Sequence, residues 1–147
     1  MGLAVAFMAT AMLTTSIGGV LAKPFYEDIS LRKTYSMVYV EDHPELLVID
    51  IRMATGPPSP YTYNQGHIQG AINVPVIESG SPNWAVLTAW IESEGQSHLD
   101  DKIIIYCVLG GFSPIGAQML IDADFKKVYS MEGGYSAWAA AGYPAEL

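Results

Sequence analysis

The sequence predicts an α/β domain with a mainly parallel central sheet of about five strands and helices on both faces of the sheet. Three observations support this prediction. Apolar runs of strand type alternate with helical patterns along most of the chain. The runs at 46–51 and 102–107 are apolar almost throughout, which is typical of parallel strands covered on both faces. The length of 147 residues, with half of them hydrophobic, suits one domain with a substantial core.

The expected elements follow one another in a regular order. We expect strands at 25–29, 46–51, 71–75, 102–107 and 126–131. We expect helices at 31–42, 83–94, 115–123 and 135–142. Ser30 is a candidate N-cap for the first helix, and the pairs Ser81-Pro82 and Ser113-Pro114 resemble a cap followed by a proline at the first helical position. Gly95 and Gly142 are expected to end the second and fourth helices.

Composition excludes several classes of function. The net charge of −8 argues against nucleic acid as a partner, because phosphates require clusters of Lys and Arg. A single cysteine cannot form a disulfide within the chain or a paired-cysteine metal site. The three histidines, at 43, 67 and 98, lie too far apart in sequence for a helical metal-binding pair. We therefore expect no metal and no cofactor.

Residues 1–22 contain no charged side chain and read as a targeting segment rather than as part of the fold. Small residues near position 22 favour a signal peptide, after which a domain spanning 23–147 would begin. About 20 apolar residues also suffice to cross a bilayer, so an uncleaved N-terminal membrane anchor is the alternative. Either outcome predicts an exported domain, in the periplasm or another extracytoplasmic compartment, with membrane contact only if the segment is retained.

The only cysteine, Cys107, comes directly after the clearest strand, where open α/β folds place their ligand crevices. The loop 108–112 then leads into the helix that Ser113 begins. Gly110 and Gly111 allow backbone N–H groups to point toward an anion, and the helix N-terminus adds partial positive charge. Both features favour a reactive thiolate. The alternative is a buried cysteine that packs as a small hydrophobic side chain.

Four motifs in this order resemble the rhodanese-like (sulfurtransferase) domain family, over about residues 25 to 144. They are "VIDIR" (48–52), "YNQGHIQGAINVP" (63–75), "IIIYC" (103–107) followed by a glycine-bearing loop, and "MEGGYSAWAAAGYP" (131–144). The second motif is quite specific to the family. The resemblance implies the three-layer fold of that family, with a central sheet between layers of helices.

The resemblance also implies a reaction. Cys107 would accept sulfane sulfur from thiosulfate, a polysulfide or a persulfide, and pass it from a persulfide to a thiol acceptor, which can belong to a protein. The anion-binding loop would consist of Val108, Leu109, Gly110, Gly111, Phe112 and Ser113. Backbone N–H groups from Gly110 onward would stabilise the persulfide anion, with the Ser113 hydroxyl as a further donor. Asp50 and Arg52 would support the sheet edge and the neighbouring loops by hydrogen bonds, and the alternative for Arg52 is that it presents its charge near the site.

The loop departs from the family pattern in its charge. Family members that use thiosulfate well often carry Arg five residues after the cysteine, where this chain has Phe112. Without charge in the loop, attraction for a dianionic donor is expected to be weaker. Ser113 also excludes the related phosphatase chemistry, which needs Arg at that position. A rhodanese-fold binding or sulfur-carrier module with weak turnover is therefore the alternative function.

The segment 53–62 is longer than the usual link between the first two motifs and is rich in proline. It is either part of the functional surface or a tolerated surface excursion. His67 in the second motif belongs to a turn, and we expect its ring to be bonded to backbone rather than to act in catalysis.

Overall fold

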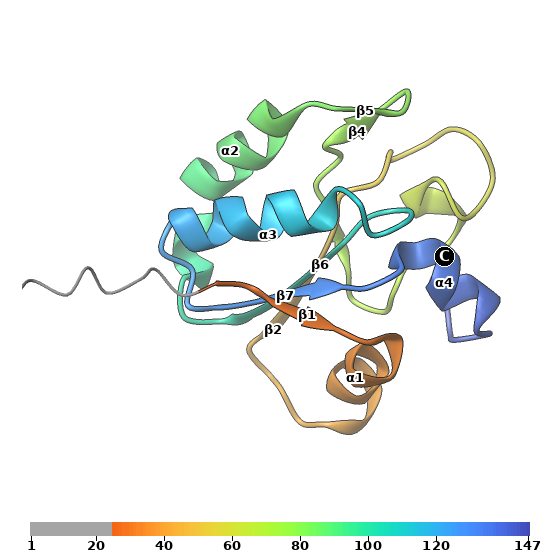
Figure 1. Ribbon diagram of the computed structural model, residues 1–147, viewed down its shortest axis with the longest axis horizontal. Coiled ribbons are helices and arrows are strands. Elements are labelled where there is room, and N and C mark those ends of the chain that lie inside the picture. Colours follow the sequence, from red (N-terminus) through yellow and green to blue (C-terminus); the bar gives the residue numbers. More distant parts are fainter. Residues whose placement is uncertain (1–24) are drawn as a thin grey trace, which may run out of the picture.

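A five-stranded parallel sheet forms the centre of the molecule, with strand order β1–β7–β6–β2–β3 (Figure 1). The computed structural model describes residues 25–147. The strands of this sheet are β1 (Glu27–Ile29), β2 (Leu46–Asp50), β3 (Ile72–Asn73), β6 (Lys102–Tyr106) and β7 (Lys127–Met131). Every neighbouring pair is parallel. The predicted fold class is thus confirmed, and each expected strand range contains an observed strand.

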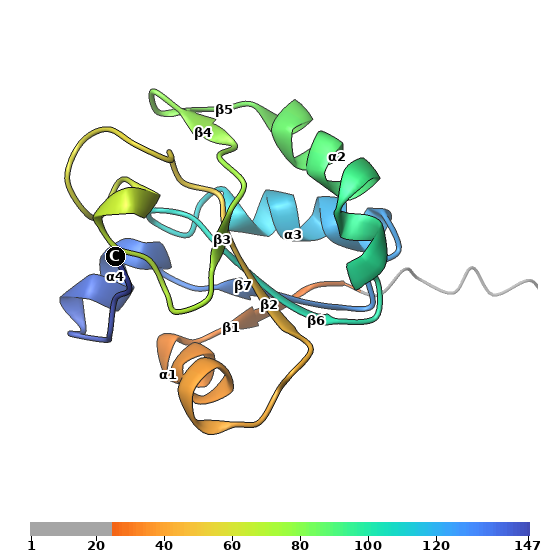
Figure 2. The ribbon, with the colours of Figure 1, turned by 180° about the vertical axis from the view of Figure 1, so that it is seen from behind.

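Helices cover both faces of the sheet (Figures 1 and 2). One face packs against α2 (Trp84–Ser93) and α3 (Ser113–Asp122). The other face packs against α1 (Leu31–Tyr35), which continues as the π-helical turn η1 (Ser36–Val40), and against α4 (Gly134–Ala140). Short 3-10 turns occur at η2 (Tyr63–Gln65) and η3 (Gly95–His98).

Alternation along β6 divides the core into two halves, because successive side chains of a strand point to opposite faces. Ile103 and Ile105 belong to the largely aliphatic cluster beneath α2 and α3. Ile104 and Tyr106 belong to the aromatic-rich cluster beneath α1 and α4. Cys107 continues the alternation and lies on the α2–α3 side.

Both cap predictions that relied on a Ser-Pro pair are wrong. Ser81–Pro82 form the strand β5, antiparallel to β4 (Ile77–Glu78). The chain reaches the next helix only after Asn83, whose N–H bonds to the Val76 carbonyl at 2.7 Å. Helix α3 begins at Ser113 itself with Phe112 as its N-cap, and Pro114 lies in its first turn. The Ser113 side chain does not cap the helix but is buried and accepts a hydrogen bond from Ser130.

The predicted first helix is confirmed in position but ends earlier and less regularly. Its last hydrogen bond joins the Glu41 N–H to the Ser36 carbonyl at 2.8 Å, a five-residue spacing. The predicted Ser30 N-cap is confirmed, since its side chain accepts a hydrogen bond from the Lys33 N–H. The second helix ends at Ser93, and a 3-10 turn follows from Gly95.

The predicted signal peptide or anchor at 1–22 lies outside the described residues. Within 25–147, no helix has both the length and the apolar character needed to cross a membrane. The expected bond between the His67 ring and backbone is confirmed: its Nδ1 lies 3.1 Å from the Tyr63 carbonyl, and its ring stacks on the Tyr63 ring with centroids 3.8 Å apart.

Candidate active site

Cys107 is delivered to the carboxyl end of the sheet by β6, which is paired with β2 on one side and β7 on the other. Four consecutive residues of β6, from Ile103 to Tyr106, are completely buried, so the strand end is held firmly. Cys107 itself is only 2% exposed. Its sulfur is therefore reached through a pocket rather than from the open surface.

The loop that follows turns back over the sulfur. The Gly110 N–H donates a hydrogen bond to Cys107 Sγ at 3.2 Å. Gly110 adopts a φ of +85°, which a side chain would disfavour. A Cβ at this position would also lie 2.9 Å from the Gly133 nitrogen. Backbone of the loop thus packs directly on backbone of the turn before α4.

The first turn of α4 holds the loop in place. The N–H groups of Tyr135 and Ser136 donate to the carbonyls of Cys107 and Val108 at 2.8 and 2.9 Å. This approach is possible only because residue 134 is glycine, since a Cβ there would lie 2.5 Å from the Val108 oxygen. In the sequence, the Gly133-Gly134 pair is recognisable only as part of a family motif. The structure assigns it a physical role, which is to let α4 dock on the cysteine loop.

A short chain of buried hydroxyl groups lies beneath the thiol. The Ser130 hydroxyl donates to Ser113 Oγ at 3.1 Å, and Ser113 Oγ lies 3.8 Å from Cys107 Sγ. Ser113 and Ser130 are at most 1% exposed. Sequence reasoning missed Ser130, which is 17 residues from Ser113 and enters the site through the pairing of β7 with β6.

A pocket of about 610 Å³ opens beside the cysteine. It is lined by Met53, Pro57, Tyr61, Ile77, Ser79, Gly80, Cys107, Val108, Leu109, Gly111 and Phe112. Five of these residues come from the predicted site. The others come from the loop after β2 and from the β4–β5 hairpin, which approach the loop after β6 at the same end of the sheet (Figure 2). The long segment 53–62 therefore contributes Met53, Pro57 and Tyr61 to one wall of the pocket.

Asp50 and Arg52 lie at the end of β2 and are completely buried. The Arg52 guanidinium donates from Nε and Nη2 to the Asp50 carboxylate, at 2.5–3.0 Å. Its remaining bonds go to the carbonyls of Pro60 and Gly66, each at 2.7 Å. Arg52 does not line the pocket. It positions the pocket wall, because it ties the end of β2 to Pro60 in the segment 53–62.

Two aromatic rings complete the surroundings of this ion pair. The Arg52 guanidinium carbon lies 3.8 Å from the centre of the Tyr135 ring and 5.5 Å from that of Tyr106. Burial, reinforced by the charge of Asp50, raises the pKa of Tyr106 well above its usual range. The Tyr106 hydroxyl accepts a hydrogen bond from the Ile68 N–H at 3.1 Å, so this tyrosine is a structural group.

Known proteins resemble this chain in sequence. Residues 38–141 match the rhodanese-like domain family. A thiosulfate sulfurtransferase named GlpE from Pseudoalteromonas translucida is 32% identical over 116 residues, which cover 79% of this chain and 91% of that protein. The chloroplastic thiosulfate sulfurtransferase 16 of Arabidopsis thaliana is 39% identical over 88 residues, covering 58% of this chain and 72% of that protein.

Solved structures resemble it in fold. The rhodanese-like domain of the Anabaena protein Alr3790 superimposes with a TM-score of 0.62 at 23% identity, covering 83% of this chain and 80% of that one. A rhodanese-related protein from Thermoplasma volcanium superimposes with a TM-score of 0.59 at 21% identity, covering 83% and 99%. Together with the matched sequence, the order of the motifs and the parallel sheet, these similarities establish that the chain belongs to the rhodanese-like domain family.

Proposed function

We propose that this protein is a sulfurtransferase that carries sulfane sulfur as a persulfide on Cys107. The observation that carries the proposal is the position of Cys107 Sγ, which lines a 610 Å³ pocket and accepts the Gly110 N–H at 3.2 Å. A donated N–H favours an anionic sulfur over a neutral thiol. The thiosulfate sulfurtransferases among the relatives support the same class of reaction.

The reaction has two steps. The Cys107 thiolate attacks the outer sulfur of thiosulfate, the S–S bond of thiosulfate breaks, and sulfite leaves with the bonding electrons. The outer sulfur of the resulting persulfide is then attacked by an acceptor thiolate. The S–S bond to Cys107 breaks, the Cys107 thiolate is released, and the acceptor leaves as a persulfide. No cofactor takes part.

The loop stabilises the anion at each stage. The Gly110 N–H holds the thiolate. Ser113 Oγ accepts from the Ser130 hydroxyl and from the Cys107 thiol, whose sulfur lies 3.8 Å away, and once the thiol proton is lost the Ser113 O–H is free to donate to the sulfur instead. The N–H groups of Gly111, Phe112 and Ser113 are the donors proposed for the outer sulfur of the persulfide. Neither step assigns a role to an adjacent general base.

An intact-mass measurement on the full chain tests the proposal. The reduced, folded protein is incubated with thiosulfate and, separately, with inorganic polysulfide. We expect a gain of one sulfur atom that dithiothreitol removes and that Cys107→Ser lacks, since this variant has no thiol at all. The absence of any gain with either donor on folded protein would contradict the proposal.

A second candidate is a sulfur-carrier or binding module with weak turnover. It is favoured by the pocket lining, which contains no charged side chain to attract an anionic donor or acceptor. Multiple-turnover production of thiocyanate, with cyanide as the acceptor, distinguishes the two functions. A carrier loads one sulfur but releases little thiocyanate, whereas an enzyme produces it continuously.

We also propose that the domain acts outside the cytoplasm, because residues 1–22 are uncharged and largely apolar. Cell fractionation with N-terminal mass analysis tests this location. A mature chain beginning near Lys23 in the soluble extracytoplasmic fraction supports a signal peptide, and an intact chain in the membrane fraction supports an anchor. An intact chain in the cytosol contradicts both.

A further inference from the structure

The pocket beside Cys107 is larger and less polar than a site for a small inorganic anion requires. Its volume of about 610 Å³ falls in the range of pockets that bind organic ligands. Met53, Pro57 and Tyr61 line one side, and Leu109 and Phe112 line the other. No charged side chain contributes to the lining.

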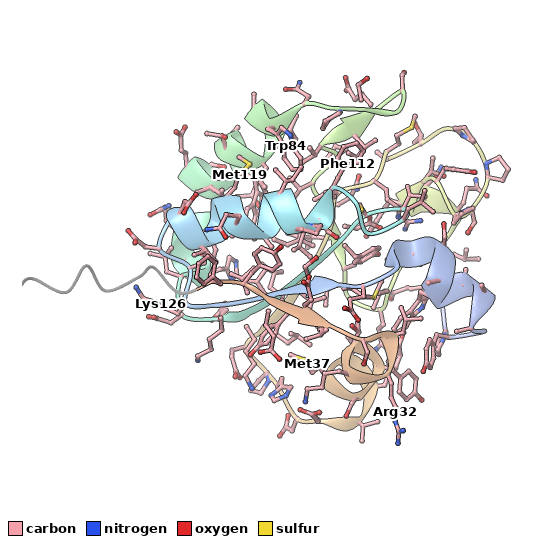
Figure 3. The ribbon with its side chains drawn as sticks, in the orientation of Figure 1. Arg32, Met37, Trp84, Phe112, Met119 and Lys126 are labelled. Carbon is pink, nitrogen blue, oxygen red and sulfur yellow. The ribbon has the colours of Figure 1, made fainter. Side chains whose placement is uncertain are left out.

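The apolar walls are held in place by bonds that do not involve a ligand. Thr62 Oγ1 donates to the Pro57 carbonyl at 2.8 Å, and the Tyr63 N–H donates to the Met53 carbonyl at the same distance. Arg52 adds its bond to Pro60. On the other side, the ring of Phe112 packs edge-on against Trp84, with centroids 6.4 Å apart (Figure 3). The pocket is therefore built before a ligand enters.

The positive charges of the described chain lie elsewhere. Lys102 and Lys127 are the first residues of β6 and β7, at the end of the sheet opposite Cys107. Figure 3 shows Lys126 at that same end, and Arg32 across the sheet from Phe112. Lys33 pairs with Glu41, and Arg52 is buried against Asp50. With a net charge of −8, the protein gives a dianion no cationic partner in the pocket and repels it at long range.

We infer that this pocket selects sulfane donors in which the transferable sulfur is carried on an apolar organic group. The inference rests on the proposed persulfide chemistry at Cys107 and names its substrate class. For an organic persulfide, the Cys107 thiolate attacks the outer sulfur, the S–S bond breaks, and the organic thiolate leaves with the electron pair. The organic group occupies the space between Tyr61 and Phe112 while Gly110 holds the reacting sulfur.

Three sulfur donors that react in the same way distinguish the effect of donor charge on the loading rate from the effect of apolar contact. Thiosulfate is a small dianion, methanethiosulfonate is a small monoanion, and benzenethiosulfonate is a monoanion with a ring. In each case thiolate attack on the terminal sulfur releases sulfite or a sulfinate and leaves the persulfide. Loading of the full chain is followed by intact mass under second-order conditions, and each rate is divided by that of free cysteine with the same donor.

We expect the normalised rate for benzenethiosulfonate to exceed that for methanethiosulfonate by about tenfold, because the ring is removed from water on binding. Thiosulfate is expected to be the slowest of the three. In the variant Met53→Ser/Tyr61→Ser, the advantage of the ring should fall to about two- or threefold. Val40→Ser is the matched control, since Val40 is 70% exposed and lies outside the pocket.

The outcomes separate this inference from the proposed function. Equal normalised rates for the two thiosulfonates, or fastest loading by thiosulfate, would overturn the inference while leaving the persulfide chemistry intact. Absence of loading by all three donors and by inorganic polysulfide would overturn the proposed function. In that case, protection of Cys107 from iodoacetamide by benzenesulfonate but not by methanesulfonate still supports apolar selectivity, and equal protection contradicts it.

Discussion

The ends of β2 and β6 are neighbours in the sheet, but one carries a buried ion pair and the other an uncharged loop. After β2 comes a fully buried ion pair, Asp50–Arg52, in which the guanidinium is bonded to the carboxylate and to two backbone carbonyls. After β6 comes an uncharged loop shaped by backbone hydrogen bonds around a single thiol. The two strand ends are joined in register, with Asp50 opposite Tyr106.

This difference indicates how the chain divides structure from chemistry. At the end of β2, the charge of Arg52 is neutralised by Asp50 inside the protein. The Arg52 side chain also bonds to Pro60 and so connects the pocket wall to the sheet. The loop after β6 relies instead on peptide N–H groups and on contact with α4, which leaves the pocket free of fixed charge. A cationic residue is therefore present near the site without lining it.

Removing the carboxylate of the buried pair should have the largest effect. Asp50→Asn leaves the Arg52 charge buried without a counterion, and we expect the free energy of unfolding to fall by about 3–5 kcal/mol. Urea denaturation measures this change, with the exposed carboxylate variant Glu78→Gln as the control. A loss below about 1 kcal/mol would mean that Arg52 is neutralised by other groups.

The substitution Gly134→Ala should cause the next largest loss of stability, because the added methyl group would press on the cysteine loop. Its Cβ would lie 2.5–2.7 Å from backbone atoms of Val108 and Cys107, so we expect a loss of about 1–3 kcal/mol beyond the cost of a left-handed backbone. Gly142→Ala is the matched control, since Gly142 also has a positive φ but has no atom within 4 Å of the added Cβ. Equal melting temperatures for the two variants would argue against close docking of α4.

Introducing a positive charge into the neutral loop after β6 should make the site more reactive toward thiosulfate. Leu109 is 73% exposed and lines the pocket, so Leu109→Arg adds a cation at little structural cost. We expect thiosulfate to load Cys107 about tenfold faster at low ionic strength, with a gain that shrinks as salt screens the charge. Leu109→Gln controls for loss of the apolar side chain. A gain of the same size in the glutamine variant, or one that salt leaves unchanged, would exclude an electrostatic cause.

The partly exposed carboxylate of Glu41 should have the smallest effect on stability. Hydrogen bonds from Lys33, Ser36 and His43 lower the pKa of Glu41 to about 2. Because this pKa is below the unfolded value of about 4.5, the stabilisation is complete above pH 4.5 and is lost as the pH falls toward 2. Glu41→Gln should therefore lower the Tm slightly at pH 7 and not at pH 2. A Tm difference that persists at pH 2 would indicate a cause other than ionisation.

The sequence was enough to predict the order along the chain of the five sheet strands and the helices, the parallel sheet and the position of Cys107 at a strand end, whereas it did not predict the β4–β5 hairpin. Those features depend on apolar periodicity and on short motifs, which act over a few neighbouring residues. It also indicated an uncharged cysteine loop, because the residue types of 108–113 can be read directly. The roles of Asp50 and Arg52 as supporting residues were anticipated from the family motif.

The segments that complete the site are far apart along the chain, and they are known only from the folded structure. Ser81-Pro82 reads locally as a helix start, but pairing with Ile77–Glu78 makes it a strand. Ser113 reads as a cap, but Ser130 on the adjacent strand draws its hydroxyl inward. The segment 53–62 becomes a pocket wall through Arg52 and Pro60, and α4 shapes the loop through Gly134. Each of these depends on contacts between residues far apart along the chain, and local sequence patterns do not encode such contacts.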